Sequence, residues 1–474
     1  MMQRGGCMQE ETMRSQAALM EQCQKNKELM AFIKERLDDA KTSVMINDAN
    51  SGDALFRYNA KIMMKPASTM KLLTAGAALD YLGGHYRFAT ALYTTGEIDG
   101  SVLNGDVYLK GSGDPTLNRD KLNSLAYSLK QQGITTVNGR LYGDDLLFDN
   151  QLLTPGIWKH DESEYYAAPI TALTMSPNGE YDTGSIIIDI TANKIGKKPR
   201  IDITPSCGDL VIINNARTVK NRASLTVERK YKSNEIIVSG CIEVNETQRK
   251  WVTVKNPTTY TLALLKEEMK HHGIQMKKNK KMTQKKIPKY AELRKIVRSE
   301  TLNQLLIPFM KLSNNGIADI LTKTMGVEIY RQGTTEAGLH VVKSFLANLE
   351  IDEETWIFED GSGMSHKNGV TTKTMNDYLY KIQHKEWFNE FIVSLPVAAK
   401  QKRLVGGTLR DRLGAKTTAY KVRAKTGSLS AVNTLAGYLE TQTGRKLLIS
   451  VYVEDAVGTI EDIDKIVEWI AKNY

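Results

Sequence analysis

The chain has 474 residues, of which 41% are hydrophobic and 25% are charged, and it carries a formal net charge of +10 at neutral pH. This composition excludes a fibrous or disordered protein, and the length is sufficient for two or three globular domains. The positive charge favours anionic surroundings such as wall polymers, lipid headgroups or nucleic acid, and charge alone does not choose among them.

The N-terminal region predicts a helix, because apolar residues recur at helical spacing between positions 11 and 38. These residues are Met13, Leu19, Met20, Leu29, Met30, Ile33 and Leu37. We expect residues 1–38 to form a helical segment that either packs on the core or lies on a membrane surface. Residues 1–27 lack the apolar core of a signal peptide, and no stretch of the chain is long enough to cross a bilayer.

Residues 42–46 and 54–58 predict a β-hairpin, and a helix with a strongly apolar pattern follows. Ser68 opens this helix, and Lys71 comes three residues later. Residues three apart share a helix face, so the lysine amine lies within hydrogen-bond reach of the serine hydroxyl. A lysine that loses its charge in a desolvated pocket can accept the proton of a serine nucleophile. A solvated lysine after an N-cap serine is the structural alternative.

Residues 90–298 show a different pattern, with short alternating strands. The predicted strands cover 184–191, 209–214, 224–229 and 234–238, and a helix at 260–272 closes the region. We therefore expect a mostly β insertion of one or two smaller domains. The lysine-rich segment at 277–289 lacks interleaved aromatic residues and base-reading motifs, so we expect a solvated loop and no nucleic-acid binding.

The cysteines and histidines show no metal-ligand spacing, so we expect no metal and no cofactor. The cysteines are Cys7, Cys23, Cys207 and Cys241. Cys207 and Cys241 lie in strand-like parts of the insertion, where either a disulfide or two buried thiols would fit.

A second polar motif contains Ser313 and Asn315, which lie in a turn between two apolar segments. Such a turn suits the delivery of a hydroxyl and a carboxamide into a cleft. A third motif, Lys425-Thr426-Gly427, ends an alternating strand pattern, and its glycine permits close backbone approach by a ligand. Together with the Ser-x-x-Lys motif, these residues supply the polar parts of a serine acyl-transfer site that needs no histidine.

The C-terminal region predicts a hairpin from strands at 434–440 and 446–453, followed by an amphipathic helix over 460–470. Strands from both ends of the chain, with helices starting near Ser68 and Asn315, imply one discontinuous α+β domain. We expect an antiparallel sheet flanked by helices over residues 39–89 and 299–474.

The three motifs together resemble those of penicillin-binding proteins and serine β-lactamases. The long separation of Ser68 from Ser313 exceeds that of the compact β-lactamases. Segments 105–117, 360–365 and 422–429 are similar to those of the low-molecular-mass class C penicillin-binding proteins, the D-alanyl-D-alanine carboxypeptidase/endopeptidase family. The resemblance runs from about residue 40 to the C-terminus and implies a transpeptidase-like fold.

This resemblance implies a role for each motif residue. Ser68 attacks the carbonyl between two terminal D-alanines, and Lys71 takes its proton. Ser313 relays a proton to the leaving amine, and Asn315 binds the peptide backbone. The substrate carboxylate contacts Lys425 and Thr426, and further implied substrate contacts are Gly427, Ser428, Leu429 and Met364. The backbone N–H groups of Ser68 and Ser428 form the implied oxyanion hole.

Relatives that favour meso-diaminopimelate hold its side chain with an acidic residue of the insertion and an arginine. Alignment by motif gives Asp144 at the acidic position, with Asp145 beside it, and His366 at the arginine position. A neutral imidazole lacks the bidentate fork of a guanidinium, for which Lys367 or an amidated substrate would compensate. The alternative is that Asp144 caps a turn.

We therefore expect a serine D-alanyl-D-alanine carboxypeptidase/endopeptidase that acts on peptidoglycan stem peptides and is acylated by β-lactams. The resemblance implies an extracytoplasmic location, in the cell wall, on the membrane surface or secreted, with peripheral association to membrane or wall. Because residues 1–27 lack a signal peptide, the resemblance also implies a mature or truncated form, or a misplaced start codon. The alternatives are a non-catalytic penicillin-binding sensor or wall-binding protein, and a serine β-lactamase. The intact motif set argues against the first, and the long insertion argues against the second.

Overall fold

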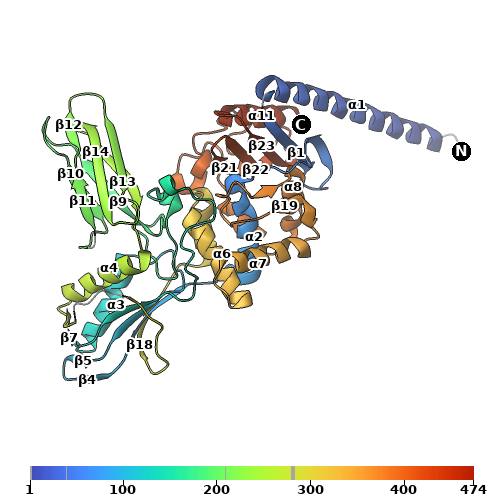
Figure 1. Cartoon of the computed structure of the whole chain (residues 1–474). Coiled ribbons are helices and arrows are strands. Elements are labelled where there is room, and N and C mark those ends of the chain that lie inside the picture. The colour runs from blue at the N-terminus through green and yellow to red at the C-terminus, as the bar shows by residue number, and fades with distance from the viewer. Residues whose placement is uncertain (1–2, 39, 209, 279–282) are drawn as a thin grey trace. The chain divides into compact units, whose positions relative to one another are not determined.

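The computed structural model describes residues 3–38, 40–208, 210–278 and 283–474 (Figure 1). The chain divides into two compact units. Unit 1 comprises Met1–Gly76, Met310–Ser313 and Lys343–Tyr474, and unit 2 comprises Ala77–Phe309 and Asn314–Val342. The predicted domain boundaries at residues 90 and 298 stay a prediction. None of the described helices is long and apolar enough to span a membrane.

Unit 1 is built on a five-stranded antiparallel sheet with the strand order β2-β1-β23-β22-β21. These strands are β1 (Lys41–Asp48), β2 (Ala54–Tyr58), β21 (Val422–Leu429), β22 (Val432–Glu440) and β23 (Lys446–Glu454). Because β1 pairs with β23, strands from the two ends of the chain lie side by side. Both predicted hairpins are confirmed, as is the discontinuous α+β fold.

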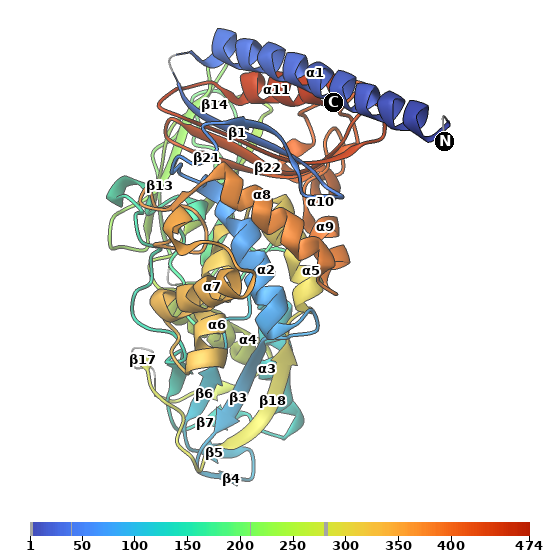
Figure 2. The same ribbon diagram turned by 90° about the vertical axis from the view of Figure 1, so that its right-hand side faces the viewer.

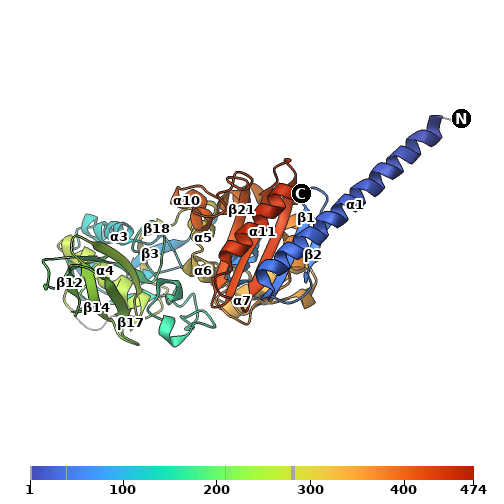
Figure 3. The ribbon, with the colours of Figure 1, turned by 90° about the horizontal axis from the view of Figure 1, so that it is seen from above.

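Helices cover both faces of this sheet, with α1 and α11 on one side and α2 and α8 on the other (Figure 2). Their bounds are α1 (Gln3–Leu37), α2 (Met70–Leu82), α8 (Thr372–Lys381) and α11 (Ile460–Asn473). Figure 3 shows α1 and α11 side by side across the sheet. Leu29 and Ile33 of α1 share one buried cluster with Ile466 of α11, whereas Met20 is 75% exposed. The C-terminal part of α1 therefore packs on the core, which is one of the two placements predicted for this helix.

Further elements lie between residues 302 and 406, where the chain passes between the two units, and α6 belongs to unit 2. They are α5 (Leu302–Lys311), α6 (Asn315–Tyr330), α7 (Thr335–Asn348), β19 (Trp356–Ile357), β20 (Gly369–Val370), α9 (Phe388–Ser394) and α10 (Arg403–Gly406). The helix α6 begins where Asn314 caps it, since the Asn314 side chain accepts a hydrogen bond from the backbone N–H of Ile317.

Residues 90–298, which lie within unit 2, are mostly β, as predicted. The sheets of unit 2 in the described part of the chain have the orders β10-β9-β15, β11-β14-β12 with β13 beside β14, β16-β7-β5-β4, and β17-β8-β6-β3-β18. The strands are β3 (Ala89–Thr94), β4 (Glu97–Asp99), β5 (Val102–Asn104), β6 (Val107–Lys110), β7 (Thr136–Val137), β8 (Leu141–Asp144), β9 (Ser185–Thr191), β10 (Arg200–Thr204), β11 (Val211–Asn214), β12 (Arg217–Val219), β13 (Ser224–Arg229), β14 (Glu235–Glu243), β15 (Thr247–Thr253), β16 (Gln275–Met276), β17 (Thr283–Gln284) and β18 (Glu292–Arg298). One apolar cluster runs through these sheets and the helices α3 (Arg119–Gln131) and α4 (Pro257–His271).

Two features of unit 2 differ from the prediction. The helix α3 was not predicted, and α4 does not close the region, because β16, β17 and β18 follow it. β18 pairs with β3, so the chain returns to the strand from which the insertion begins. Most β18 side chains are exposed, which removes the alternation on which strand prediction depends. Cys207 and Cys241 are thiols rather than a disulfide.

The segment Met310–Ser313 is held inside unit 1 by the Lys311 side chain, which is only 3% exposed. Its amine donates a hydrogen bond to the backbone carbonyl of Leu395. Gly407 packs against the same residue so closely that a Cβ there would lie 2.3 Å from the Lys311 carbonyl oxygen. Burial, with a smaller contribution from the charge of Arg423, lowers the pKa of Lys311 to about 8.

The lowered pKa of Lys311 predicts a pH dependence of stability. Between pH 8 and about 10.5 the unfolded chain binds more protons at this amine than the folded chain does. The free energy of unfolding should therefore rise with pH in this window, by up to about 1.4 kcal/mol per pH unit. We expect the stability of Lys311→Met relative to wild type to fall from pH 8 to pH 10 in urea titrations. A relative stability that stays constant would contradict the prediction.

Candidate active site

Ser68 lies in the 3-10 helix η1 (Ala67–Thr69), which leads directly into α2. Lys71 donates from Nζ to Ser68 Oγ at 3.0 Å and to the Ser362 carbonyl oxygen at 2.6 Å. The Lys71 side chain is completely buried, whereas Ser68 is partly exposed. A serine hydroxyl that a substrate can reach therefore faces an amine that is removed from water.

The backbone around Ser68 is tightly enclosed. Ala67 has a φ of +45°, which is uncommon for a residue with a side chain. A Cβ on Gly363 would lie 1.8 Å from the Ala67 carbonyl oxygen, and a Cβ on Gly427 would lie 2.7 Å from the Ser68 backbone nitrogen. The two glycines thus let the loop at 360–368 and the strand β21 approach η1 from within unit 1. Any larger residue at either position would displace the serine.

A buried carboxylate organises the loop at 360–368. Asp360 is completely buried, and its two oxygens accept hydrogen bonds from the backbone N–H groups of Ser362, Gly363, Met364 and Ser365, from the hydroxyl of Ser362 and from the side-chain amide of Asn368. These bonds fix the Ser362 carbonyl that accepts from Lys71. The sequence pattern gave Asp360 no role beyond its place in the family-like segment 360–365. An acidic residue that opens an Asp-Gly-Ser-Gly turn is the signal that predicts such a carboxylate-capped loop.

A second serine and lysine pair lies in the same unit. Lys425 of β21 donates from Nζ to Ser313 Oγ at 2.8 Å and to the Thr426 carbonyl oxygen at 2.6 Å. Complete burial holds the pKa of Lys425 well below its usual value, and the charge of the nearby Lys71 lowers it further. Ser313 has a φ of +59°, so the turn presents its hydroxyl from the left-handed conformation. Unit 1 therefore brings Ser68, Lys71, Ser313 and Lys425 into two hydrogen-bonded pairs.

The predicted substrate contacts of β21 differ in exposure. Thr426 is buried, and its hydroxyl donates to the hydroxyl of Thr408 at 2.7 Å. Ser428 is exposed, and its hydroxyl donates to the Asn433 side chain at 2.9 Å. Leu429 is partly exposed. Thr408 was missed by sequence reasoning, because nothing in its local pattern indicates that it meets β21.

The loop at 360–368 carries three further predicted residues. Met364 and His366 are partly exposed, and Lys367 is exposed. The Lys367 amine donates to a carboxylate oxygen of Glu359 at 2.9 Å. Lys367, which was expected to compensate for the missing arginine, is thus engaged in an ion pair with Glu359.

Asn315, Asp144 and Asp145 belong to unit 2. The Asn315 side-chain amide donates to the Tyr166 carbonyl oxygen at 2.9 Å. Asp144 ends β8 and accepts from the backbone N–H groups of Leu146 and Ile287 at 3.4 and 3.0 Å.

Asp145 has a different environment from its neighbour. Its Oδ2 accepts from the Gln284 side chain at 2.6 Å and from the Thr258 hydroxyl. Its Oδ1 is buried without a hydrogen-bond partner among the described residues. A buried carboxylate oxygen without a donor is costly, which is a signal for a cationic ligand that sequence reasoning could not see. Within the described ranges, no three His, Cys, Asp or Glu side chains are grouped as metal ligands.

Comparisons with known proteins agree with this geometry. The model of the D-Ala-D-Ala carboxypeptidase 3 (S13) family matches residues 26–473. A D-alanyl-D-alanine carboxypeptidase of Actinomadura sp. (strain R39) is 33% identical over 414 residues, which cover 86% of this chain and 77% of the relative. The D-alanyl-D-alanine carboxypeptidase DacB of Haemophilus influenzae is 29% identical over 433 residues, which cover 88% and 86% of the two chains.

A solved structure gives the same result. The crystal structure of penicillin binding protein 4 (dacB) from Haemophilus influenzae matches with a TM-score of 0.78 and 25% identity, over 93% of this chain and 97% of that one. The fold and the family that the three motifs predict are thereby confirmed. The chain belongs to the D-Ala-D-Ala carboxypeptidase 3 (S13) family.

Proposed function

We propose that Ser68, Lys71, Ser313, Asn315 and Lys425 carry out the D-alanyl-D-alanine carboxypeptidase reaction in this protein. As a member of its family the protein is a serine-type DD-peptidase, and the sensor and β-lactamase alternatives are not favoured. The observation that carries the assignment of residues is the pair of hydrogen bonds Lys71 to Ser68 and Lys425 to Ser313. Each bond joins a hydroxyl to an amine that is shielded from water.

Acylation begins when Ser68 Oγ attacks the carbonyl carbon between the two terminal D-alanines. The hydroxyl proton passes to a neutral Lys71 Nζ, which lies 3.0 Å from Oγ. Collapse of the tetrahedral intermediate breaks the peptide bond. The proton that Lys71 took from Ser68 passes through Ser313 to the leaving D-alanine amine, which returns Lys71 to its neutral form. Water then attacks the ester on Ser68 and loses a proton to Lys71. The ester bond breaks as Lys71 passes this proton to Ser68 Oγ, and the shortened peptide is released.

The remaining residues bind substrate. The free carboxylate of the terminal D-alanine contacts Lys425 and Thr426, and it offsets the cost of a charged Lys425 amine in this dry site. Asn315 binds the peptide backbone. Backbone N–H groups of Ser68 and Ser428 hold the oxyanion, a contribution of about 10² to 10³ in rate for each donor in known enzymes. Gly427, Leu429 and Met364 line the same site.

β-Lactams acylate the same serine in this proposal. The penicillin binding protein 4 of Haemophilus influenzae, whose structure in complex with a β-lactam has a TM-score of 0.74 and 27% identity to this chain, supports the assignment. The substrates are stem peptides of peptidoglycan, with endopeptidase action where the stems are cross-linked. Since this polymer lies outside the cytoplasmic membrane, the protein works there.

Ser68→Ala should abolish covalent penicillin labelling and D-alanine release, because it removes only the hydroxyl that forms the ester. Lys71→Ala should come close to the same loss, because the serine then keeps its proton. Ser430→Ala, which removes an exposed hydroxyl near the end of β21, is the matched control and should retain both activities. Intact-protein mass spectrometry checks the adduct, and an undiminished adduct on Ser68→Ala would refute the nucleophile.

Asp360→Asn should slow acylation, because Asp360 positions the Ser362 carbonyl that accepts from Lys71. Asp360 itself has no contact with the substrate in this proposal. An amide cannot accept at both ends, so the Ser362 carbonyl loses part of the support that aims it at Lys71. We expect a fall of about tenfold or more in the acylation rate and a changed pH profile of that rate. Glu359→Gln alters the neighbouring carboxylate and should leave the profile unchanged. Equal profiles for the Asp360 variant and wild type would reject the positioning role.

Asp144 remains the proposed contact for the free amine of the stem-peptide side chain. Asp144→Asn keeps an acceptor for the backbone and removes the charge, so it should slow cleavage of peptides with a side-chain amine far more than penicillin acylation. Asp145→Asn is the comparison, because Asp145 Oδ1 is the buried acceptor without a partner among the described residues. If only the Asp145 variant cleaves peptides with a side-chain amine more slowly, Asp145 rather than Asp144 contacts that amine. Equal slowing of both substrates would reject a side-chain contact.

A further inference from the structure

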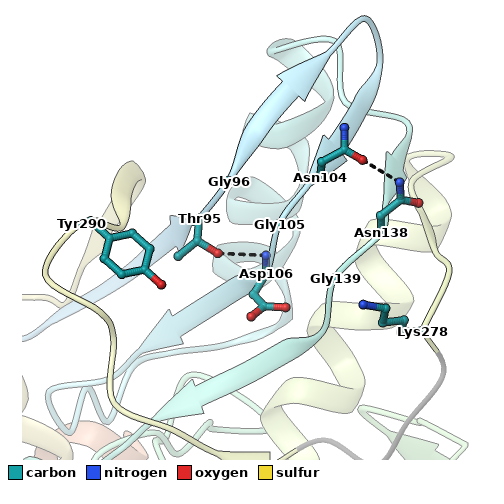
Figure 4. A pocket seen from close by; sticks show the side chains of 9 residues that line it. All are labelled: Thr95, Gly96, Asn104, Gly105, Asp106, Asn138, Gly139, Lys278 and Tyr290. Carbon is teal, nitrogen blue, oxygen red and sulfur yellow. Dashed lines mark hydrogen bonds between the residues drawn. The ribbon is translucent and has the colours of Figure 1, made fainter.

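A second candidate binding site lies in unit 2, in a pocket of about 490 Å³ at the place where strands pass from one sheet to another (Figure 4). Beside the pocket the chain passes from one sheet to another twice, once between β5 and β6 and once between β7 and β8. Gly105 and Gly139 make the crossing possible, since a Cβ on Gly139 would lie 2.0 Å from the Gly105 carbonyl oxygen. The pocket floor is therefore closely packed backbone. A volume of this size lies within the range of small-molecule sites.

The polar side chains of this pocket leave hydrogen-bonding groups for a ligand. Asn138 donates from Nδ2 to Asn104 Oδ1 at 2.7 Å, which leaves an amide donor on Asn104 and a carbonyl acceptor on Asn138. Asp106 accepts from the Arg140 backbone N–H through Oδ1 at 2.8 Å. Among the described residues, its Oδ2 receives only a long contact of 3.5 Å from the Tyr108 hydroxyl. Carboxylate and amide groups beside one another match a ligand whose hydroxyls both donate and accept.

An aromatic ring and a cation complete the lining. Tyr290 is 77% exposed, and Figure 4 shows its ring at one side of the hollow with Lys278 at the other. A large aromatic side chain this exposed offers a flat apolar surface with a polar tip. Lys278 supplies N–H donors that suit a carbonyl or hydroxyl oxygen. The carboxylate of Asp106 opposes binding of a phosphate or another compact anion.

We propose that this pocket binds an N-acetylated sugar ring of the glycan strand that carries the stem peptides. The sugar hydroxyls bond to Asp106 and the Asn104–Asn138 pair, its acetamido oxygen accepts from Lys278, and one face of the ring stacks on Tyr290. The inference rests on the proposed function, because that function makes peptidoglycan the substrate. The pocket adds affinity for glycan-linked substrate and takes no part in the chemistry at Ser68.

The test uses the full chain and a soluble tetramer of N-acetylglucosamine as the probe, with binding measured by calorimetry. Tyr290→Ala and Asp106→Asn should each weaken binding about tenfold or more. Tyr231→Ala removes another exposed tyrosine of unit 2, outside the pocket, and should bind as wild type does. Thermal unfolding of each variant identifies any loss that comes from misfolding.

Kinetics supply the second readout. The pocket variants should raise KM for D-alanine release from stem peptides on glycan chains and leave penicillin acylation and free-pentapeptide hydrolysis unchanged. Wild-type protein that does not bind the tetramer, or a folded Tyr290→Ala variant that binds it equally well, would overturn the proposal. Ser68→Ala separates the two hypotheses, since it should lose acylation and keep sugar binding. A penicillin adduct on that variant would refute the catalytic assignment alone.

Discussion

The chemistry of unit 1 depends on the removal of two lysine amines from water. Lys71 and Lys425 are completely buried, and a buried ammonium group is costly unless hydrogen bonds and opposite charge compensate it. The hydrogen bonds of the two amines include those to the hydroxyls of Ser68 and Ser313 and to the carbonyl oxygens of Ser362 and Thr426. Burial lowers the pKa of Lys425, whose amine meets the substrate carboxylate in the proposed mechanism. In the same mechanism Lys71 acts as the general base, a role that requires its amine without the proton.

The architecture of unit 1 serves to hold these amines in place. Asp360 fixes a glycine-rich loop as a support for the Ser362 carbonyl, and Gly363 and Gly427 let backbone approach Ala67 and Ser68 from two directions. The central pairing of β1 with β23 supplies the sheet on which β21 and its lysine are fixed. The proposed catalytic site, which is assembled from distant segments, thus depends on packing that tolerates no added side chain at the contact points.

Prediction succeeded where the physical signal is local. The hairpins around 50–53 and 441–445 follow from alternating side chains and turn residues, and the terminal helix follows from its apolar spacing. The strand β18 and the helix α3 were missed, the strand because most of its side chains are exposed. Backbone pairing with β3 decides where β18 lies, and the identities of its side chains say little about this pairing.

The sequence by itself determined the family, the nucleophile candidate and the order of the motifs, because Ser-x-x-Lys, Ser-x-Asn and Lys-Thr-Gly name chemical groups at fixed spacing. Only the tertiary structure decided that Lys425 meets Ser313 and that Asp360 supports Lys71 through Ser362. The pocket beside Tyr290 likewise exists only where two strand crossings coincide. These contacts join residues far apart in the chain, and their burial and hydrogen bonding arise from packing, which no local pattern encodes.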